Sequence, residues 1–185
     1  MNIRVYYKKS KNTPKERAFM KTGTVLGSRP MTFPWGFDEE ADSCRSLKLE
    51  MLQQIMVLRQ AGVTCWHIVP DCGVGLYAAE MLLLLGRKDP ELTLYCVIPY
   101  EEQAAKWAPY LRERYFDVLS GCAAVEPVSL RKTDTCVADA YHYAVQKADT
   151  VLFVSSGAPC ADSAIFRGKD VICIDALTGK THIRV

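Results

Sequence analysis

The stretch VTCWHIVPDCGVGLYAAEMLLLLGRKDPELTLYCVIP, residues 63–99, decides the fold class because two strand patterns flank a helical one. Residues 63–70 are rich in β-branched and aromatic side chains, which predicts a buried strand. A turn with two glycines follows, and then a helix that is apolar almost all round and ends near Leu85. Residues 92–99 repeat the strand pattern. This order predicts two parallel strands joined through a helix.

The same alternation of strand and helix patterns continues on both sides of this unit. Strands that read as near-continuous apolar runs are typical of a parallel sheet covered on both faces. We therefore expect an α/β fold, namely a doubly wound, mostly parallel sheet with helices on both faces. The remaining expected elements are strands at 23–30, 122–130, 149–157 and 170–176, helices at 38–61, 101–119, 135–148 and about 161–166, and an edge strand within 177–185.

Length and charge predict one globular domain with a basic extension. The chain has 185 residues, of which 49% are hydrophobic and 24% charged, and its net charge of +2 is too small to imply a nucleic-acid partner. Residues 1–21 hold seven basic residues and one acid, a balance of +6, so the remainder carries 2 − 6 = −4. We expect a basic arm at 1–21 and one doubly wound α/β domain at 22–185. The arm is either a solvated extension or a contact for nucleic acid or an acidic partner.

The chain shows neither a secretory signal nor an apolar run long enough to span a membrane. Its eight cysteines are scattered and form no C-x-x-C pair, which argues against a zinc or thioredoxin-type site. Buried free thiols in a reducing compartment explain this pattern best, so we expect a cytoplasmic protein without a metal or a tightly bound cofactor.

In doubly wound sheets, ligands bind at the carboxyl ends of the strands near the point where the strand order reverses. The first strand ends in Gly27, Ser28, Arg29 and Pro30. A turn glycine, a hydroxyl and a guanidinium suit a phosphate, because Arg offers two parallel donors to an oxyanion. An ordinary turn with a surface arginine remains the alternative.

The second strand end carries Asp71, Gly73 and Gly75 ahead of the apolar helix. Small residues there let a ligand approach the helix N-terminus, whose free N–H groups favour an anion. A dinucleotide fingerprint is disfavoured, because Ala78 stands at the third glycine position and Glu91 precedes the next strand instead of ending it.

Further candidates are Glu80 inside the apolar helix, Tyr100 after the third strand, and Ser155, Ser156 and Gly157 after the fifth. A carboxylate in such a helix is costly unless it is paired or reaches solvent or ligand. Glu80 is therefore either a ligand contact, an exposed residue, or the partner of a nearby arginine. The serines offer hydroxyl and amide hydrogen bonds to a phosphate or ribose.

Four separated motifs occur in an order that resembles one known family. They are GSRP (27–30), GVGLYAAE (73–80), IPYEEQAAKW (98–107) and KADTVLFVSSG (147–157). Together they are similar to motifs of the YpsA-like proteins of the SLOG superfamily, the Smf/DprA and LOG group. The resemblance covers roughly residues 23–176.

The resemblance implies a Rossmann-like fold that binds nucleotides or nucleotide-derived molecules at the strand ends. LOG members cleave nucleoside monophosphates at the N-glycosidic bond, and Smf/DprA members bind single-stranded DNA. This chain lacks the PGGxGTxxE motif that carries LOG catalysis. The residues that the resemblance assigns to the pocket are Gly27, Arg29, Gly73, Tyr77, Glu80, Tyr100, Trp107 and Ser155 to Gly157.

We therefore predict a protein that binds a small nucleotide derivative and has a sensor or regulatory role. One alternative is an N-glycoside hydrolase or transferase acting on nucleoside monophosphates, with Glu80 as the catalytic candidate. A second alternative is single-stranded DNA binding through the basic arm. The apolar helix is expected to be buried either within one chain or between copies in a homo-oligomer.

Overall fold

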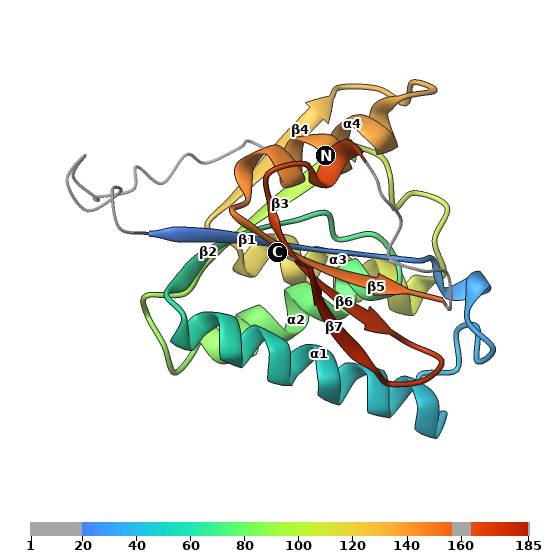
Figure 1. Cartoon of the computed structure of the whole chain (residues 1–185). Helices are drawn as coiled ribbons and strands as arrows, with labels where there is room; N and C mark the ends of the chain where they lie inside the picture. The colour runs from blue at the N-terminus through green and yellow to red at the C-terminus, as the bar shows by residue number, and fades with distance from the viewer. Residues whose placement is uncertain (1–19, 157–163, 185) are drawn as a thin grey trace.

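The computed structural model describes residues 20–156 and 164–184 (Figure 1). The basic arm expected at 1–21 lies almost entirely outside the described residues, and so does Gly157.

The described strands form a seven-stranded sheet in the order β4-β3-β2-β1-β5-β6-β7. The first six strands run parallel, and β1 pairs with both β2 and β5. β7 pairs antiparallel with β6 and closes one edge, as expected for the end of the chain. The strands are β1 (Lys21–Gly27), β2 (Val63–Ile68), β3 (Thr93–Tyr100), β4 (Ala124–Ser129), β5 (Thr150–Ser155), β6 (Asp170–Asp175) and β7 (Thr181–Arg184).

In the described part of the chain, four α-helices cover the two faces of this sheet, which confirms the predicted Rossmann-like fold class (Figure 1). On one face, Met51, Leu76 and Val118 from three helices share an apolar cluster with Trp66 of β2. On the other face, Ala144 of the fourth helix packs against β2 and β3. The helices are α1 (Asp42–Gln60), α2 (Val74–Gly86), α3 (Pro109–Gly121) and α4 (Cys136–Lys147), with short 3-10 helices η2 (Pro30–Thr32) and η3 (Ala164–Phe166).

The position of α2 explains why its sequence is apolar almost all round. It lies between α1 and α3 and also packs on the sheet, so three of its sides contact protein. Leu76, Ala78 and Ala79 have no exposed surface, whereas Leu84 is 57% exposed. A helix enclosed in this way needs apolar residues around most of its circumference. Most of the apolar surface of α2 is therefore buried within one chain, and its burial does not itself require a second copy.

The expected helix over 101–119 is wrong in its first half. Residues 101–107 form turns, and α3 begins only at Pro109. Proline disfavours helical backbone in the residue before it, and Ala108 accordingly has φ −55° and ψ 145°. The expected helix at 161–166 is reduced to η3, and its first three residues lie outside the described part.

The expectation of free thiols holds for most of the described cysteines but is wrong for Cys173, which is disulfide-bonded. Within the described ranges, no helix is long and apolar enough to cross a membrane. The free thiols are those of Cys44, Cys65, Cys72, Cys96, Cys122 and Cys136.

Candidate functional site

The junction of β1 and β5 is the point where the strand order reverses. α1 follows β1 on one face, whereas η3, which comes after β5, lies on the face covered by α4. At the carboxyl end of this strand pair, the Ser28 backbone N–H donates to the Val154 carbonyl at 3.2 Å. The Ser28 hydroxyl lies 3.4 Å from that of Ser156. Two hydroxyls predicted from separate strand ends therefore meet where doubly wound sheets bind ligands.

Arg29 and Asp71 face each other across the ends of β1 and β2. The closest approach is 4.0 Å between Arg29 Nε and Asp71 Oδ2, and the arginine side chain is 68% exposed. Among the described residues, the Arg29 guanidinium has no hydrogen-bond acceptor within normal distance. Such a long, solvated ion pair contributes little to stability. The guanidinium is therefore available to a ligand.

The Asp71 carboxylate is held on both of its oxygens. Oδ1 accepts a hydrogen bond from the Cys72 backbone N–H at 2.8 Å, and Oδ2 accepts one from the Tyr141 hydroxyl at 3.2 Å. Burial, and secondarily the Asp71 charge, raises the pKa of Tyr141 well above its usual value. The same two causes raise the pKa of Cys72 to about 11. At neutral pH both neighbours are therefore protonated, and Cys72 is no thiolate nucleophile.

Three glycines at the predicted site allow close packing of the protein's own elements. A Cβ on Gly27 would lie 2.6 Å from the Val74 side chain, and one on Gly75 would lie 2.1 Å from the Val69 carbonyl oxygen. Gly73, the N-cap of α2, has φ 95°, and its Cβ would lie 2.8 Å from Pro30. These contacts press the turns after β1 and β2 together. The glycines thus place Arg29 and Asp71 side by side.

The first turn of α2 leaves donors free at the same edge. Leu76 N–H donates to the Asp71 carbonyl at 2.9 Å. Within 20–156 and 164–184, the N–H groups of Gly73, Val74 and Gly75 have no acceptor, and no side chain caps the helix. Uncapped N–H groups at a helix N-terminus attract anions.

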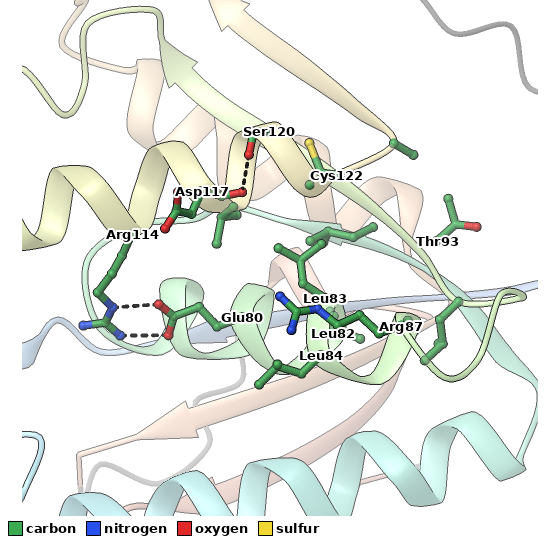
Figure 2. A pocket seen from close by; sticks show the side chains of 16 residues that line it. Glu80, Leu82, Leu83, Leu84, Arg87, Thr93, Arg114, Asp117, Ser120 and Cys122 are labelled. Atoms are coloured by element: carbon green, nitrogen blue, oxygen red, sulfur yellow. Dashed lines mark hydrogen bonds and ion pairs between the residues drawn. The ribbon is translucent and has the colours of Figure 1, made fainter.

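Tyr77 and Glu80 contact a separate ion-pair cluster on the other side of α2. Arg114 of α3 donates to both Glu80 oxygens, at 2.6 and 2.8 Å (Figure 2), and to both Glu39 oxygens, at 2.6 and 3.2 Å. Lys48 of α1 also contacts Glu39, at 2.6 Å, and lies 4.5 Å from the centre of the buried Tyr77 ring. Of the three alternatives for Glu80, the structure shows the pairing with an arginine.

Glu39 accepts hydrogen bonds from both cations of this cluster, Arg114 and Lys48. Burial raises the pKa of the Glu39 carboxyl, but hydrogen bonds from Arg114 and Lys48 outweigh that effect and hold it below its usual value. The acids, in turn, raise the pKa of Arg114. Both shifts favour the charged forms of Glu39 and Arg114. Among the described residues, neither Glu80 nor Tyr77 forms a hydrogen bond with Ser28 or Asp71.

The other residues predicted for the site are Ser155, Tyr100 and Trp107, and they lie in three different surroundings. Ser155 ends β5 and is 5% exposed, whereas the neighbouring Ser156 is half-buried at the junction. Tyr100 is half-buried at the end of β3, two strands away from β1. Trp107 packs edge-to-face on Tyr115, with ring centres 5.3 Å apart, so its main role is packing.

A groove of about 980 Å³ opens between α2 and α3 (Figure 2). Its walls are formed mainly by leucines of α2 and by the facing side of α3, and it shares only Glu80 and Arg114 with the ion-pair cluster. It lies apart from the strand-end residues. The described residues bring no three His, Cys, Asp or Glu side chains together as a metal-ligand set.

Among the described residues, Tyr141 makes a contact at the strand ends that sequence reasoning missed. Residues 135–148 read as a helix, and α4 does span Cys136–Lys147. Nothing in the spacing shows that this tyrosine reaches across the face of the sheet to Asp71, 70 positions away. Its position depends on how closely α4 packs, where Ala140 and Ala144 contact β2 and β3.

Comparison with known proteins finds relatives over more than half of the chain. The UPF0398 protein of Halalkalibacterium halodurans is 31% identical over 108 residues, which is 57% of this chain and 57% of that protein. The UPF0398 protein of Bacillus licheniformis is 26% identical over 138 residues, 73% of this chain and 74% of that protein. The chain therefore spans little more than half the length of the first of these relatives.

A solved structure of DNA processing protein A from Helicobacter pylori, from work on its single-stranded DNA binding mode, has a TM-score of 0.49 and 10% identity. The match covers 86% of this chain and 69% of that one. The family model YpsA, described as the YspA SLOG family, matches residues 24–158. Because that match covers well over half of the sequence, the chain belongs to the YspA SLOG family.

Proposed function

We propose that this protein binds a nucleotide or nucleotide-derived ligand at the carboxyl ends of β1, β2 and β5, in a sensor or regulatory role. The observation that carries the proposal is the exposed Arg29 guanidinium, which has only a 4.0 Å contact to Asp71. A solvated arginine beside free backbone donors favours a phosphate, because both groups offer hydrogen bonds to an oxyanion.

Two further features support a phosphate at this edge. The Ser28 and Ser156 hydroxyls lie 3.4 Å apart, and both can donate to the same oxyanion. The uncapped first turn of α2 adds backbone N–H groups and the positive end of its dipole. Arg29 would offset part of the phosphate charge, and Asp71 has acceptor positions left for another part of the ligand.

A binding role is favoured over hydrolysis by the state of Glu80. Glu80 is held by two hydrogen bonds from Arg114 in the ion-pair cluster, and among the described residues none of its hydrogen bonds reaches a strand-end residue, so it is not placed to activate water there. We also propose a cytoplasmic location, because six described cysteines are free thiols; the disulfide at Cys173 is the feature that this location leaves unexplained.

A thermal-shift panel tests the proposal. The full chain is heated with AMP, GMP, CMP, UMP, ADP-ribose or inorganic phosphate, and each binding constant is then measured by titration calorimetry. A bound ligand raises the melting temperature by mass action. We expect at least one nucleotide to raise it and Arg29→Gln to remove the shift. Arg112→Gln, which alters an exposed arginine of α3, should leave the shift unchanged.

The alternatives give different results in the same samples. Chromatography that detects free base would establish N-glycoside hydrolysis, and salt-dependent binding of single-stranded DNA without any nucleotide shift would favour a nucleic-acid function. A flat melting temperature across the panel would contradict the proposed function.

A further inference from the structure

We propose that Asp71 accepts a hydrogen bond from a ribose hydroxyl of the ligand, and that Tyr141 is the residue that positions it. This inference rests on the proposed function and assigns the part of the ligand that Asp71 contacts. It predicts that the site prefers ribonucleotides to their deoxy forms.

The place of Asp71 in the sheet is the first argument. It follows β2, directly beside the end of β1, where Arg29 and Ser28 would hold the phosphate. In Rossmann-like folds, phosphate binds at the turn after the first strand, and an acidic side chain near the end of the next strand accepts the ribose hydroxyl. Asp71 occupies this position.

Glu91, the acid that sequence spacing suggests for this role, does not occupy it. Glu91 lies before β3, at the opposite end of the sheet, and its carboxylate pairs with Arg59 at the end of α1. The ribose-binding acid is therefore identified by its position in the sheet and not by its distance in sequence from the glycines.

The hydrogen bonds of Asp71 are the second argument. Each carboxylate oxygen already accepts one hydrogen bond, from Cys72 N–H or from the Tyr141 hydroxyl. A carboxylate offers about four acceptor positions, so about one remains on each oxygen. The side chain is 20% exposed, which leaves it accessible from the strand-end edge while its orientation is fixed.

Tyr141 fixes that orientation from the far face of the sheet. Its hydroxyl reaches Asp71 Oδ2 at 3.2 Å from α4, and its ring packs in the clusters on this face that include Val145 and Ala144. A neutral phenol at this position can only donate to the carboxylate. Without it, the carboxylate would turn about its side-chain bonds, and the acceptor would lose its defined direction.

Arg29 completes the arrangement without blocking it. At 4.0 Å from Oδ2, its guanidinium offsets the carboxylate charge but forms no hydrogen bond with it. Because a phosphate and a carboxylate repel each other, a cation between them allows both to bind one ligand. The 3′- and 2′-hydroxyls lie at the opposite side of the ribose from a 5′-phosphate, which suits recognition by two neighbouring strand ends.

Selectivity for ribose is the test. The nucleotide that gives the largest thermal shift is compared by calorimetry with its 2′-deoxy and 3′-deoxy forms. A site that hydrogen-bonds a substrate hydroxyl rejects the analogue that lacks it, so we expect at least about a tenfold loss of affinity for one deoxy form.

Three variants assign the roles. In Asp71→Asn the ratio of ribo to deoxy affinity should fall close to one, because a neutral amide is a weaker acceptor. Tyr141→Phe should lower the same ratio several-fold, an effect that a general loss of stability would not produce. Tyr143→Phe removes a hydroxyl from the same helix near Glu126 and should leave the ratio unchanged.

Each outcome decides between claims. Equal affinity of the wild-type protein for the ribo and both deoxy forms would overturn the ribose assignment while leaving nucleotide binding intact. If Tyr141→Phe weakened all forms equally, the positioning role of Tyr141 would be wrong. Absence of any nucleotide shift would overturn the proposed function, and the ribose assignment with it.

Discussion

Arg114 on α3 donates two hydrogen bonds to the Glu80 carboxylate on α2, through Nε at 2.6 Å and Nη2 at 2.8 Å. This bidentate pair joins two helices of one face, and the same guanidinium reaches Glu39 in the segment before α1. The Glu80 carboxylate in the apolar helix is therefore explained by its partner. It belongs to the structural framework around the site.

Removing the guanidinium should destabilise the fold. In Arg114→Met the carboxylates of Glu80 and Glu39 would remain, half-buried and without their main partner. We expect a loss of about 1–3 kcal/mol, less than for a fully buried pair because water reaches all three side chains. Denaturant titration measures this loss.

The matched control is Arg112→Met, which changes an exposed arginine on the same helix and should cost less than about 0.5 kcal/mol. Equal stability of the two variants would contradict a structural role for the cluster.

Acid should weaken the same cluster. The folded pKa of Glu39 lies below its ordinary value of 4.5, so its contribution to stability is complete above that value. As the pH falls through 4.5 and then through the lowered folded pKa, protonation removes the contribution. Measured from pH 7 downwards, the unfolding free energy of Glu39→Gln should fall less steeply than that of the wild type. Parallel curves would show that Glu39 carries none of the acid sensitivity.

The packing glycine of α2 gives a third prediction. Gly75→Ala would place a Cβ 2.1 Å from the Val69 carbonyl oxygen, a backbone atom that cannot move independently. We expect a loss of about 3 kcal/mol or more, since the first turn of α2 would have to shift. Thermal and denaturant unfolding measure it.

Gly86→Ala is the control, because the nearest atom to its Cβ would be the Leu92 carbonyl oxygen at 3.9 Å. Alanine is the better helix former by about 0.5–1 kcal/mol. This variant should therefore be neutral or slightly more stable. A mild effect of Gly75→Ala would contradict the close approach of the first turn of α2 to the Val69 carbonyl.

The pairing of Glu80 with Arg114 predicts that the protein does not hydrolyse N-glycosidic bonds. Because Glu80 is held by Arg114 in the ion-pair cluster and forms no hydrogen bond with a described strand-end residue, the wild-type protein should release no free base from nucleoside monophosphates. Glu80→Gln should still bind the nucleotide that the panel identifies. If the wild type released free base and Glu80→Gln did not, the protein would be an N-glycoside hydrolase that uses Glu80.

Much of the fold could be predicted from local patterns. Strand at 63–70 and helix from about residue 74 to 85 correspond to β2 and α2, because apolar runs, glycines and prolines act over a few residues. The helix start at Pro109 was missed because the spacing of Trp107 with Leu111 and Tyr115 suggested one continuous helix. Pro109 determines where α3 begins, although the apolar spacing continues before it.

The candidate site could be predicted only in part. The rule that ligands bind at the carboxyl ends of strands identifies Ser28, Arg29 and Asp71 as candidates. In the structure, the Ser28 hydroxyl lies near that of Ser156, and Arg29 lies near Asp71. The partners of the acids could not be predicted, because Tyr141 reaches Asp71 and Arg114 reaches Glu80 across distances of 70 and 34 residues. Such contacts depend on how whole helices pack on the sheet.

The central claim is that the exposed Arg29 guanidinium beside Asp71 binds the phosphate of a nucleotide-like ligand. The most direct measurement is calorimetric titration of wild type, Arg29→Gln and Arg112→Gln with the nucleotide that shifts the melting temperature most. We expect the first and third proteins to bind with equal affinity and Arg29→Gln to bind at least about tenfold more weakly, as loss of a charge-assisted hydrogen bond implies. Unchanged affinity in Arg29→Gln would contradict the account.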